Sequence, residues 1–233
     1  MHGSTATLGL VGGLGPESTI DYYRRILAGW SRFDPTTAPS ILIDSLDVNR
    51  LLRLVETDRA AMVDEIVASV ARLAGGGSSF AAITANTPHV SFDEIAARSP
   101  IPLVSIVESC ATEARRRGLA RLGLLGTRFT MEGSFYPTVF ARAGLAIVTP
   151  DADERVWLHE RYVGELLVGT FRDETRRGVV ALVERLRADE HIDGVILGGT
   201  ELPLLLREST VAGLPALDTT ALHVTALVER LRA

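Results

Sequence analysis

The sequence has little cysteine and few aromatic residues, and both shortages limit what the chain can be. Cys110 is the one cysteine among 233 residues, so an intrachain disulfide, a thiolate metal cluster and a CxxC redox pair are excluded. Aromatic residues make up 6% of the chain and hydrophobic residues 46%, so we expect a core mainly of Leu, Val, Ile and Ala. A chain without disulfides is typical of the reducing cytoplasm, which is the location that we expect.

Long apolar runs and basic stripes are also missing. No apolar run approaches the roughly 18 to 20 residues that a membrane span requires, and no charged-then-apolar beginning resembles a signal peptide. The formal net charge is −5, and the basic residues are mixed with acids, as between Arg172 and Arg177. Such mixed runs are typical of solvated helix faces. We therefore expect neither a membrane nor a nucleic acid as a partner.

What the sequence does contain is a regular alternation of short apolar runs with amphipathic stretches. Strands are predicted at Thr7 to Val11, Ile41 to Ile43, Phe80 to Thr84, Leu103 to Ile106, Arg121 to Leu125, Ala146 to Val148, Gly194 to Leu197 and Ala216 to Leu217. Helices are predicted at Pro16 to Trp30, Arg59 to Ala74, Glu108 to Arg117, Glu132 to Ala143, Glu154 to Gly169, Thr175 to Ala188 and Thr219 to Arg232. The predicted fold class is α/β, with parallel sheets flanked by helices.

Two motifs recur at the same offset of 114 residues. Gly9-Leu10-Val11-Gly12-Gly13 is echoed by Gly123-Leu124-Leu125-Gly126-Thr127, and Ile83-Thr84-Ala85-Asn86-Thr87 by Leu197-Gly198-Gly199-Thr200-Glu201. A chance match of two short motifs is the alternative to duplication. Duplication predicts two pseudo-symmetric domains, residues 1–104 plus 216–233 and residues 105–215. Because ligands of open α/β sheets bind beyond the carboxyl ends of strands, we expect a small-molecule site in the cleft between the two domains.

The glycine-rich turn after the first strand is a candidate anion site. Gly13, Leu14 and Gly15 precede a predicted helix, where backbone N–H groups can approach a negatively charged ligand. A dinucleotide fingerprint fits less well, because Ser18 stands at the third glycine position and Pro16 removes one donor. A turn with a purely structural role remains the other reading.

Polar residues stand at the ends of the repeated motifs. Asn86 and Thr87 are candidates to bind a carboxylate, as are Thr127 and Thr200 in the second half, with Arg50 or Arg128 as a weaker candidate to pair with a second carboxylate. The alternative for Asn86 and Thr87 is that they cap the next helix.

Histidine and cysteine spacing indicates no metal site. His2, His159 and His191 show no ligand pattern, His89 and His223 are candidates to line the cleft, and Cys110 is predicted to be a buried helix residue.

Several of these segments together resemble one family, the aspartate/glutamate racemases that work without pyridoxal phosphate. The matching segments are Gly9 to Thr19, Asn86 to His89, Ser105 to Glu108, Leu124 to Glu132, Phe171 to Glu174, Gly194 to Gly198, Thr200 to Pro203 and Leu217 to Thr220. The resemblance implies two pseudo-symmetric α/β domains with the active site between them. It also implies a small carboxylate or amino acid as ligand and no cofactor; we further expect a homodimer.

The same resemblance implies a mechanism that this chain cannot use. In the family, one cysteine takes the α-proton and a second cysteine returns a proton on the opposite face. The positions of those cysteines are occupied here by Ala85 and Gly199, and neither side chain carries a proton. If the chain is an enzyme, the remaining candidates for proton carriers are Thr84, His89, Glu132 and Glu201.

Three functional hypotheses follow from this departure. The first is an enzyme that uses the same pocket for other chemistry on a carboxylic acid, such as elimination, decarboxylation, cyclisation or isomerisation. The second is a non-catalytic binder of small acids. The third is an amino-acid racemase, either with other bases or as an inactive variant of a cysteine enzyme.

Overall fold

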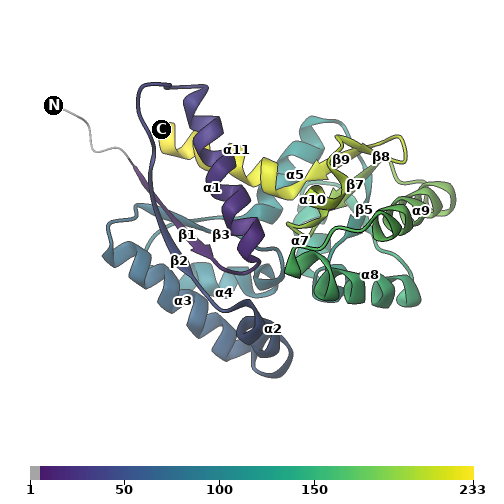
Figure 1. Ribbon diagram of the computed structural model, residues 1–233, viewed down its shortest axis with the longest axis horizontal. Coiled ribbons are helices and arrows are strands. Elements are labelled where there is room, and N and C mark those ends of the chain that lie inside the picture. The colour runs from purple at the N-terminus through teal and green to yellow at the C-terminus, as the bar shows by residue number, and fades with distance from the viewer. Residues whose placement is uncertain (1–5) are drawn as a thin grey trace. The chain divides into compact units, whose positions relative to one another are not determined.

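The computed structural model describes residues 6–233, and His2 lies outside the described residues. The chain divides into two compact units, of which the first is Met1–Ile106 with His223–Ala233 and the second is Val107–Leu222 (Figure 1). The chain passes from the first unit to the second at the beginning of helix α5 (Ile106–Arg116) and returns inside helix α11 (Thr219–Arg232).

The first unit is built on a parallel sheet of four strands in the order β2-β1-β3-β4. Its strands are β1 (Thr7–Gly12), β2 (Ser40–Ser45), β3 (Phe80–Ile83) and β4 (Leu103–Val104). Its helices are α1 (Pro16–Ser31), α2 (Val48–Thr57), α3 (Arg59–Gly75), the 3-10 helix η1 (Thr87–Ser91), α4 (Phe92–Arg98) and most of α11. Buried side chains of α1 and α11, among them Ile26 and Leu227, pack against Leu8 and Leu10 of the central strand β1.

The second unit has five strands in the order β6-β5-β7-β9-β8, all parallel except β8 at the edge. The strands are β5 (Arg121–Leu125), β6 (Ala146–Val148), β7 (Gly194–Leu197), β8 (Thr210–Val211) and β9 (Leu214–Asp218). The helices are α5, α6 (Arg128–Glu132), α7 (Phe135–Arg142), α8 (Ala152–Gly164), η2 (Leu166–Val168), α9 (Asp173–Glu190) and α10 (Leu202–Leu206).

The two units repeat one topology. The order β2-β1-β3-β4 in the first sheet corresponds to β6-β5-β7-β9 in the second. The register of the central pair is also the same, since Leu8 lies opposite Phe80 and Leu122 lies opposite Gly194, each 114 residues later. The two predicted pseudo-symmetric α/β folds, with parallel sheets flanked by helices, are therefore present, and the 114-residue offset relates equivalent positions in them.

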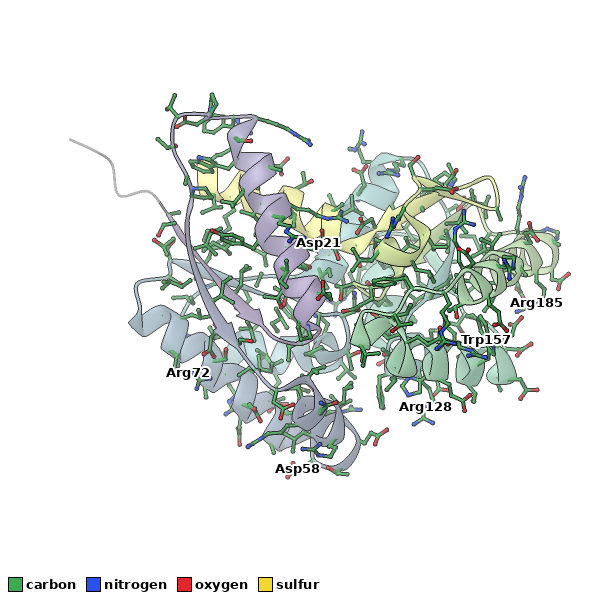
Figure 2. The ribbon with its side chains drawn as sticks, in the orientation of Figure 1. Asp21, Asp58, Arg72, Arg128, Trp157 and Arg185 are labelled. Carbon is green, nitrogen blue, oxygen red and sulfur yellow. The ribbon has the colours of Figure 1, made fainter. Side chains whose placement is uncertain are left out.

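Helix α8 is held against α9 by contacts along its length. The ring of Trp157 packs where a Cβ on Gly178 of α9 would stand, since that Cβ would lie 2.5 Å from Cη2 of the indole. An ion pair joins Glu154 of α8 to Arg185 of α9; Trp157 and Arg185 are labelled in Figure 2. A capping box formed by Asp151 and Glu154 fixes the beginning of α8. These contacts set the position of the side chains that α8 directs into the core.

The structure differs from the sequence-based division at the strand around residue 216. Ala216 lies opposite Val195 in the second sheet, whereas the sequence division placed residues 216–233 in the first domain. A strand that pairs with β7 must belong to the same sheet as β7, so the chain returns to the first unit only at His223. The predicted helix from Glu132 to Ala143 is likewise two helices, because α6 ends at Glu132 and α7 begins at Phe135. Within residues 6–233, no helix combines the length and the apolar character needed to cross a membrane.

Candidate functional site

The two positions at which the family cysteines are expected are structurally equivalent. The residue before each of them forms one more backbone hydrogen bond to the neighbouring strand. The N–H of Thr84 donates to the carbonyl of Val11 (3.0 Å), and the N–H of Gly198 donates to the carbonyl of Leu125 (2.7 Å). Ala85 and Gly199 are the next residues, just beyond the carboxyl ends of the central strands β3 and β7. Ligands of parallel α/β sheets bind beyond such strand ends, so each unit carries one candidate position at the carboxyl end of its own sheet.

The glycine-rich turn in the first unit is shaped by its own contacts. Gly13 has a φ of 78°, and a Cβ there would lie 2.6 Å from the backbone nitrogen of Leu46, so only glycine fits. Its N–H donates to Oγ1 of Thr19 (2.9 Å), and that hydroxyl donates to the carbonyl of Gly15. Three residues, Gly13, Leu14 and Gly15, are predicted to bind an anion. The backbone N–H of Gly13 is therefore already hydrogen-bonded within the turn.

Thr84, a candidate proton carrier, has a structural role. Its side chain is completely buried, and its hydroxyl donates to the carbonyl of Val11 (3.0 Å). The hydroxyl of Ser18 in α1 donates to the carbonyl of Thr84 (3.2 Å). These bonds fasten β3 to β1 and α1, so the hydroxyl of Thr84 is already engaged by the sheet.

Ala85, Asn86 and Thr87 all lie buried at the end of β3, with exposed fractions of 7%, 3% and 8%. Asn86 is the N-cap of η1, yet no side chain there makes a capping hydrogen bond. Ser91, the N-cap of α4, makes none either. The alternative in which Asn86 and Thr87 serve as helix caps is therefore wrong for these two helices, and both remain candidate ligand contacts.

His89 is a buried structural histidine in the neutral state. Its Nδ1 lies 3.0 Å from the carbonyl of Ala85, which can only accept, so Nδ1 carries the proton. Nε2 then accepts from the N–H of Ile106 (3.4 Å). Burial lowers the pKa of His89 to about 3, with the nearby His223 as a further cause. With both ring nitrogens engaged, His89 fixes the backbone at Ala85 rather than carrying a proton.

His223 is fixed in the same way. Its Nε2 donates to the carbonyl of Val104 (3.0 Å) and its Nδ1 accepts from the hydroxyl of Tyr22 (2.9 Å). Burial lowers its pKa to about 4. The neutral ring ties α11 to α1 and β4, so the prediction that His223 lines the ligand site finds no support in its contacts.

In the second unit, Thr127 accepts a hydrogen bond from the N–H of Thr130 (3.3 Å) and is the N-cap of α6. It is 5% exposed. The glycine after β5, Gly126, is packed against the carbonyl of Gly198, which a Cβ would approach to 2.7 Å. The turn is therefore as compact as its counterpart in the first unit.

Glu132 is an exposed residue at the end of α6. Its side chain is 47% exposed and forms an ion pair with Nε of Arg155 (3.2 Å). The prediction that a helix begins at Glu132 is wrong, because Glu132 is the last residue of α6 and the helix breaks at Gly133. Among the proposed carriers, Glu132 is the least suited to hold a proton away from water.

At Gly199 the space for a side chain is already filled. A Cβ on Gly199 would lie 2.5 Å from the hydroxyl oxygen of Tyr162 and 2.7 Å from Cζ of the same ring. Tyr162 belongs to α8 and is 3% exposed. The phenol of Tyr162 thus occupies the place into which the family's second thiol would project, and no local sequence pattern indicates this relationship.

Glu201 is the buried acid behind this phenol. The hydroxyl of Tyr162 donates to Oε2 of Glu201, and the hydroxyl of Thr200 donates to the same oxygen (3.0 Å). Oε1 is buried without a hydrogen-bond partner. Burial raises the pKa of Glu201, and burial with the neighbouring carboxyl raises that of Tyr162. Of the four candidate carriers, Glu201 alone combines burial with an unused polar atom.

The candidate arginines have other contacts. Arg50 pairs with Glu65 (2.9 Å), and the guanidinium of Arg128 lies 5.6 Å from the centre of the Phe129 ring. Cys110 is completely buried, as predicted, and burial raises the pKa of its thiol far above the ordinary value. Across residues 6–233, no three His, Cys, Asp or Glu side chains are grouped as a metal ion would require.

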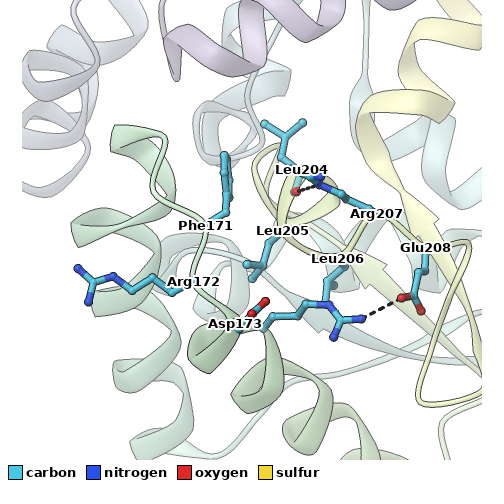
Figure 3. A pocket seen from close by; sticks show the side chains of 9 residues that line it. Phe171, Arg172, Asp173, Leu204, Leu205, Leu206, Arg207 and Glu208 are labelled. Atoms are coloured by element: carbon cyan, nitrogen blue, oxygen red, sulfur yellow. Dashed lines mark hydrogen bonds and ion pairs between the residues drawn. The ribbon is translucent and has the colours of Figure 1, made fainter.

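A cavity of about 330 Å³ lies elsewhere in the second unit, between the beginning of α9 and the end of α10 (Figure 3). Its three arginines already have partners: Arg172 pairs with Glu165 (3.9 Å), Arg176 with Glu208 (2.9 Å), and Arg207 donates to the carbonyl of Leu204 (3.1 Å). None of the predicted site residues lines it.

Comparison with known proteins shows what the chain is similar to. The family model for Asp/Glu/hydantoin racemases matches residues 11–227. The broad specificity amino-acid racemase RacX of Bacillus subtilis (strain 168) is 25% identical over 224 residues, which cover 92% of this chain and 93% of that protein.

Two solved structures are similar over nearly the whole chain. A putative Asp/Glu racemase from Yersinia pestis has a TM-score of 0.87 and 29% identity, covering 98% of this chain and 100% of that one. An aspartate racemase homologue from Pyrococcus horikoshii OT3 has a TM-score of 0.82 and 31% identity, covering 97% and 99%.

Proposed function

Because the chain belongs to the Asp/Glu/hydantoin racemase family, we propose that it is a cofactor-independent enzyme that acts on a small carboxylic or amino acid by chemistry other than two-thiol racemisation. The observation that carries this proposal is the loss of both thiols. Ala85 offers no titratable group, Gly199 has no side chain, and the thiol of Cys110 is buried with a raised pKa.

The acid-binding part of the proposal is supported by the surroundings of the two strand ends. Asn86 and Thr87 in the first unit and Thr200 in the second are buried polar residues beyond the central strands. Amide and hydroxyl groups in such positions are suited to a small carboxylate, which gains from charged hydrogen bonds.

The binding test is a thermal shift with a panel of small amino and dicarboxylic acids. A ligand that binds only the folded state raises the melting temperature by mass action. Asn86→Ala should weaken that stabilisation by about 1 to 3 kcal/mol, because a buried hydrogen bond to a charged group is lost. An unchanged shift in the variant would remove Asn86 from the site, and the absence of any shift across the panel would remove the proposed ligand class.

The catalytic test follows optical activity and α-proton exchange together. We expect L-aspartate and L-glutamate to keep their circular dichroism signal, as in a heat-killed control, because no thiol pair is present. We also expect iodoacetamide to leave turnover unchanged, since Cys110 is shielded. Loss of optical signal, or inactivation by the reagent under folding conditions, would contradict the proposal.

Racemisation of an amino acid by other bases is a second candidate, and the likeness to a broad specificity amino-acid racemase favours it. The two are distinguished by stereochemistry, since a racemase exchanges the α-proton and loses optical activity at comparable rates. Binding without exchange or turnover would instead indicate a non-catalytic acid binder.

A further inference from the structure

The pairing of Tyr162 with Glu201 stands where the family position at residue 199 has lost its side chain. A Cβ on Gly199 would fall 2.5 Å from the Tyr162 hydroxyl oxygen, so this hydroxyl lies within the volume of the absent side chain. Glycine at residue 199 and tyrosine at residue 162 therefore belong together: one provides the space that the other fills.

An apolar ring would be enough to fill the space beside Gly199, but the ring that fills it carries a hydroxyl group. A phenylalanine at residue 162 would supply the same ring without a buried hydroxyl. Instead the hydroxyl donates to Oε2 of Glu201, a carboxyl that is 1% exposed. A buried carboxyl is costly unless its oxygens are satisfied, and Oε1 of Glu201 has no hydrogen-bond partner. Packing alone therefore does not explain why the Tyr162 hydroxyl and the Glu201 carboxyl are buried together.

Glu165, another buried carboxylate of the second unit, shows what a structural acid looks like there. It accepts from Arg161 (2.8 Å) and from the hydroxyl of Thr175 (2.6 Å), and these contacts hold its pKa below the ordinary value. The hydrogen bonds that act on the pKa of Glu201 come instead from the hydroxyls of Tyr162 and Thr200 and from its own backbone N–H, none of which carries a charge. Unlike Glu165, Glu201 therefore receives its hydrogen bonds from uncharged groups, and burial leaves its pKa raised.

We propose that Tyr162 and Glu201 form the proton-carrying pair of this protein, with the Tyr162 hydroxyl meeting the substrate carbon and Glu201 accepting the proton behind it. The inference rests on the proposed function and names the residues that carry it out.

The step is a two-proton relay. As the bond between the substrate carbon and its proton breaks, that proton forms a bond to the Tyr162 oxygen, and the phenolic proton moves to Oε2 of ionised Glu201. The negative charge leaves Glu201 and appears on the substrate as a carbanion next to its carboxylate. The reverse step returns a proton to the carbon from the same side.

One-sided exchange is the consequence. At the equivalent position of the first unit, Ala85 has no proton to give, the hydroxyl of Thr84 donates to Val11, and both nitrogens of His89 are engaged. A carbanion formed through Tyr162 therefore regains its proton through Tyr162. The α-proton exchanges with solvent and the configuration is retained.

The experiment measures α-proton exchange in D₂O by NMR and optical activity by circular dichroism on the same samples, with the panel of amino and dicarboxylic acids used for binding. We expect exchange without loss of optical signal. The exchange rate should rise with pH through the raised pKa of the Glu201 carboxyl, because only the ionised form accepts the proton.

Tyr162→Phe keeps the ring and removes the hydroxyl; it should lower exchange about a hundredfold or more while the acid still raises the melting temperature. Glu201→Gln should do the same and abolish the pH dependence, which serves if Tyr162→Phe fails to fold. Tyr22→Phe is the matched control, since it also removes a buried hydroxyl that donates to a buried side chain, and it should leave exchange unchanged.

Failure of the inference and failure of the proposed function give different results. Exchange that persists in both Tyr162→Phe and Glu201→Gln overturns the pair and leaves the proposed function intact. Exchange accompanied by racemisation overturns the one-sided relay. If the wild-type protein binds an acid of the panel and turns it over without α-proton exchange, the pair is overturned and the proposed function stands. If it binds an acid and shows neither exchange nor turnover, both are overturned, and the pair is a packing feature.

Discussion

The phenol of Tyr162, in α8, lies where a side chain on Gly199, just after β7, would begin. The two residues are 37 positions apart in the sequence and meet because α8 packs against the core of the second unit. This relationship makes the loss of the second thiol more than a single substitution, since a side chain at residue 199 now competes with a buried ring.

Gly199→Ala is therefore expected to destabilise the protein by about 1 to 3 kcal/mol, the usual cost of overpacking a core. Urea denaturation of the variant and the wild type measures this. Gly164→Ala is the control for the added methyl group, because Gly164 lies in the same unit, at the end of α8, and a Cβ there meets nothing within 4 Å. Equal stabilities of Gly199→Ala and Gly164→Ala would mean that Tyr162 yields without cost.

Restoring the thiols should require removal of the phenol. Ala85→Cys with Gly199→Cys is expected to bind an acid poorly and show no racemisation while Tyr162 remains, because the new side chain and the ring need the same volume. Adding Tyr162→Ala should allow racemisation, followed by circular dichroism. Activity in the double variant that the third change does not improve would show that the ring is no obstacle.

Much of the fold is predictable from the sequence because its signals are local. The apolar runs that became β1, β3, β5 and β7 are short, bounded by glycine or polar residues, and repeat at 114 residues, so both the strands and their equivalence can be read from spacing. Helix α2 had a readable signal as well: Asp47 caps it, and Leu51 and Val55 form its buried face. Because α2 is short and lies directly before α3, its signal is difficult to separate from that of α3.

The candidate site was only partly predictable, for a different reason. Sequence identifies residue 199 as a position that has lost its thiol, but the residue that fills the space comes from another helix, and no local pattern marks Tyr162. The roles of His89 and Thr84 were also hidden, since a polar residue at a strand end reads the same whether it faces a ligand or bonds to a neighbouring carbonyl.

Glu132 is expected to be dispensable. Its side chain is 47% exposed and pairs with Arg155 at the surface, and exposed ion pairs contribute about 0 to 1 kcal/mol. Glu132→Gln should keep both turnover and stability within that range, measured by α-proton exchange and urea denaturation. A hundredfold loss of turnover with binding retained would return Glu132 to the list of proton carriers.

Acid should destabilise the first unit through its two buried histidines. His89 and His223 are neutral in the folded protein, with pKa values lowered to about 3 and about 4, whereas an unfolded histidine has a pKa of about 6.5. Below that value the unfolded chain binds protons that the folded chain excludes. Stability is therefore complete above about pH 6.5 and is lost as the pH falls toward the folded pKa values.

Between pH 7.5 and pH 5.5 each histidine should cost about 1.4 kcal/mol, or about 3 kcal/mol together. Urea denaturation at the two pH values measures the loss. His223→Asn removes one titrating group, so the variant, although less stable at pH 7.5 because the bonds to Tyr22 and Val104 change, should lose only about half as much on acidification. The slope of stability against pH isolates the protonation effect from that packing cost. An equal pH-dependent loss in variant and wild type would show that His223 is not protonated on unfolding, and would contradict its assignment as a buried neutral ring.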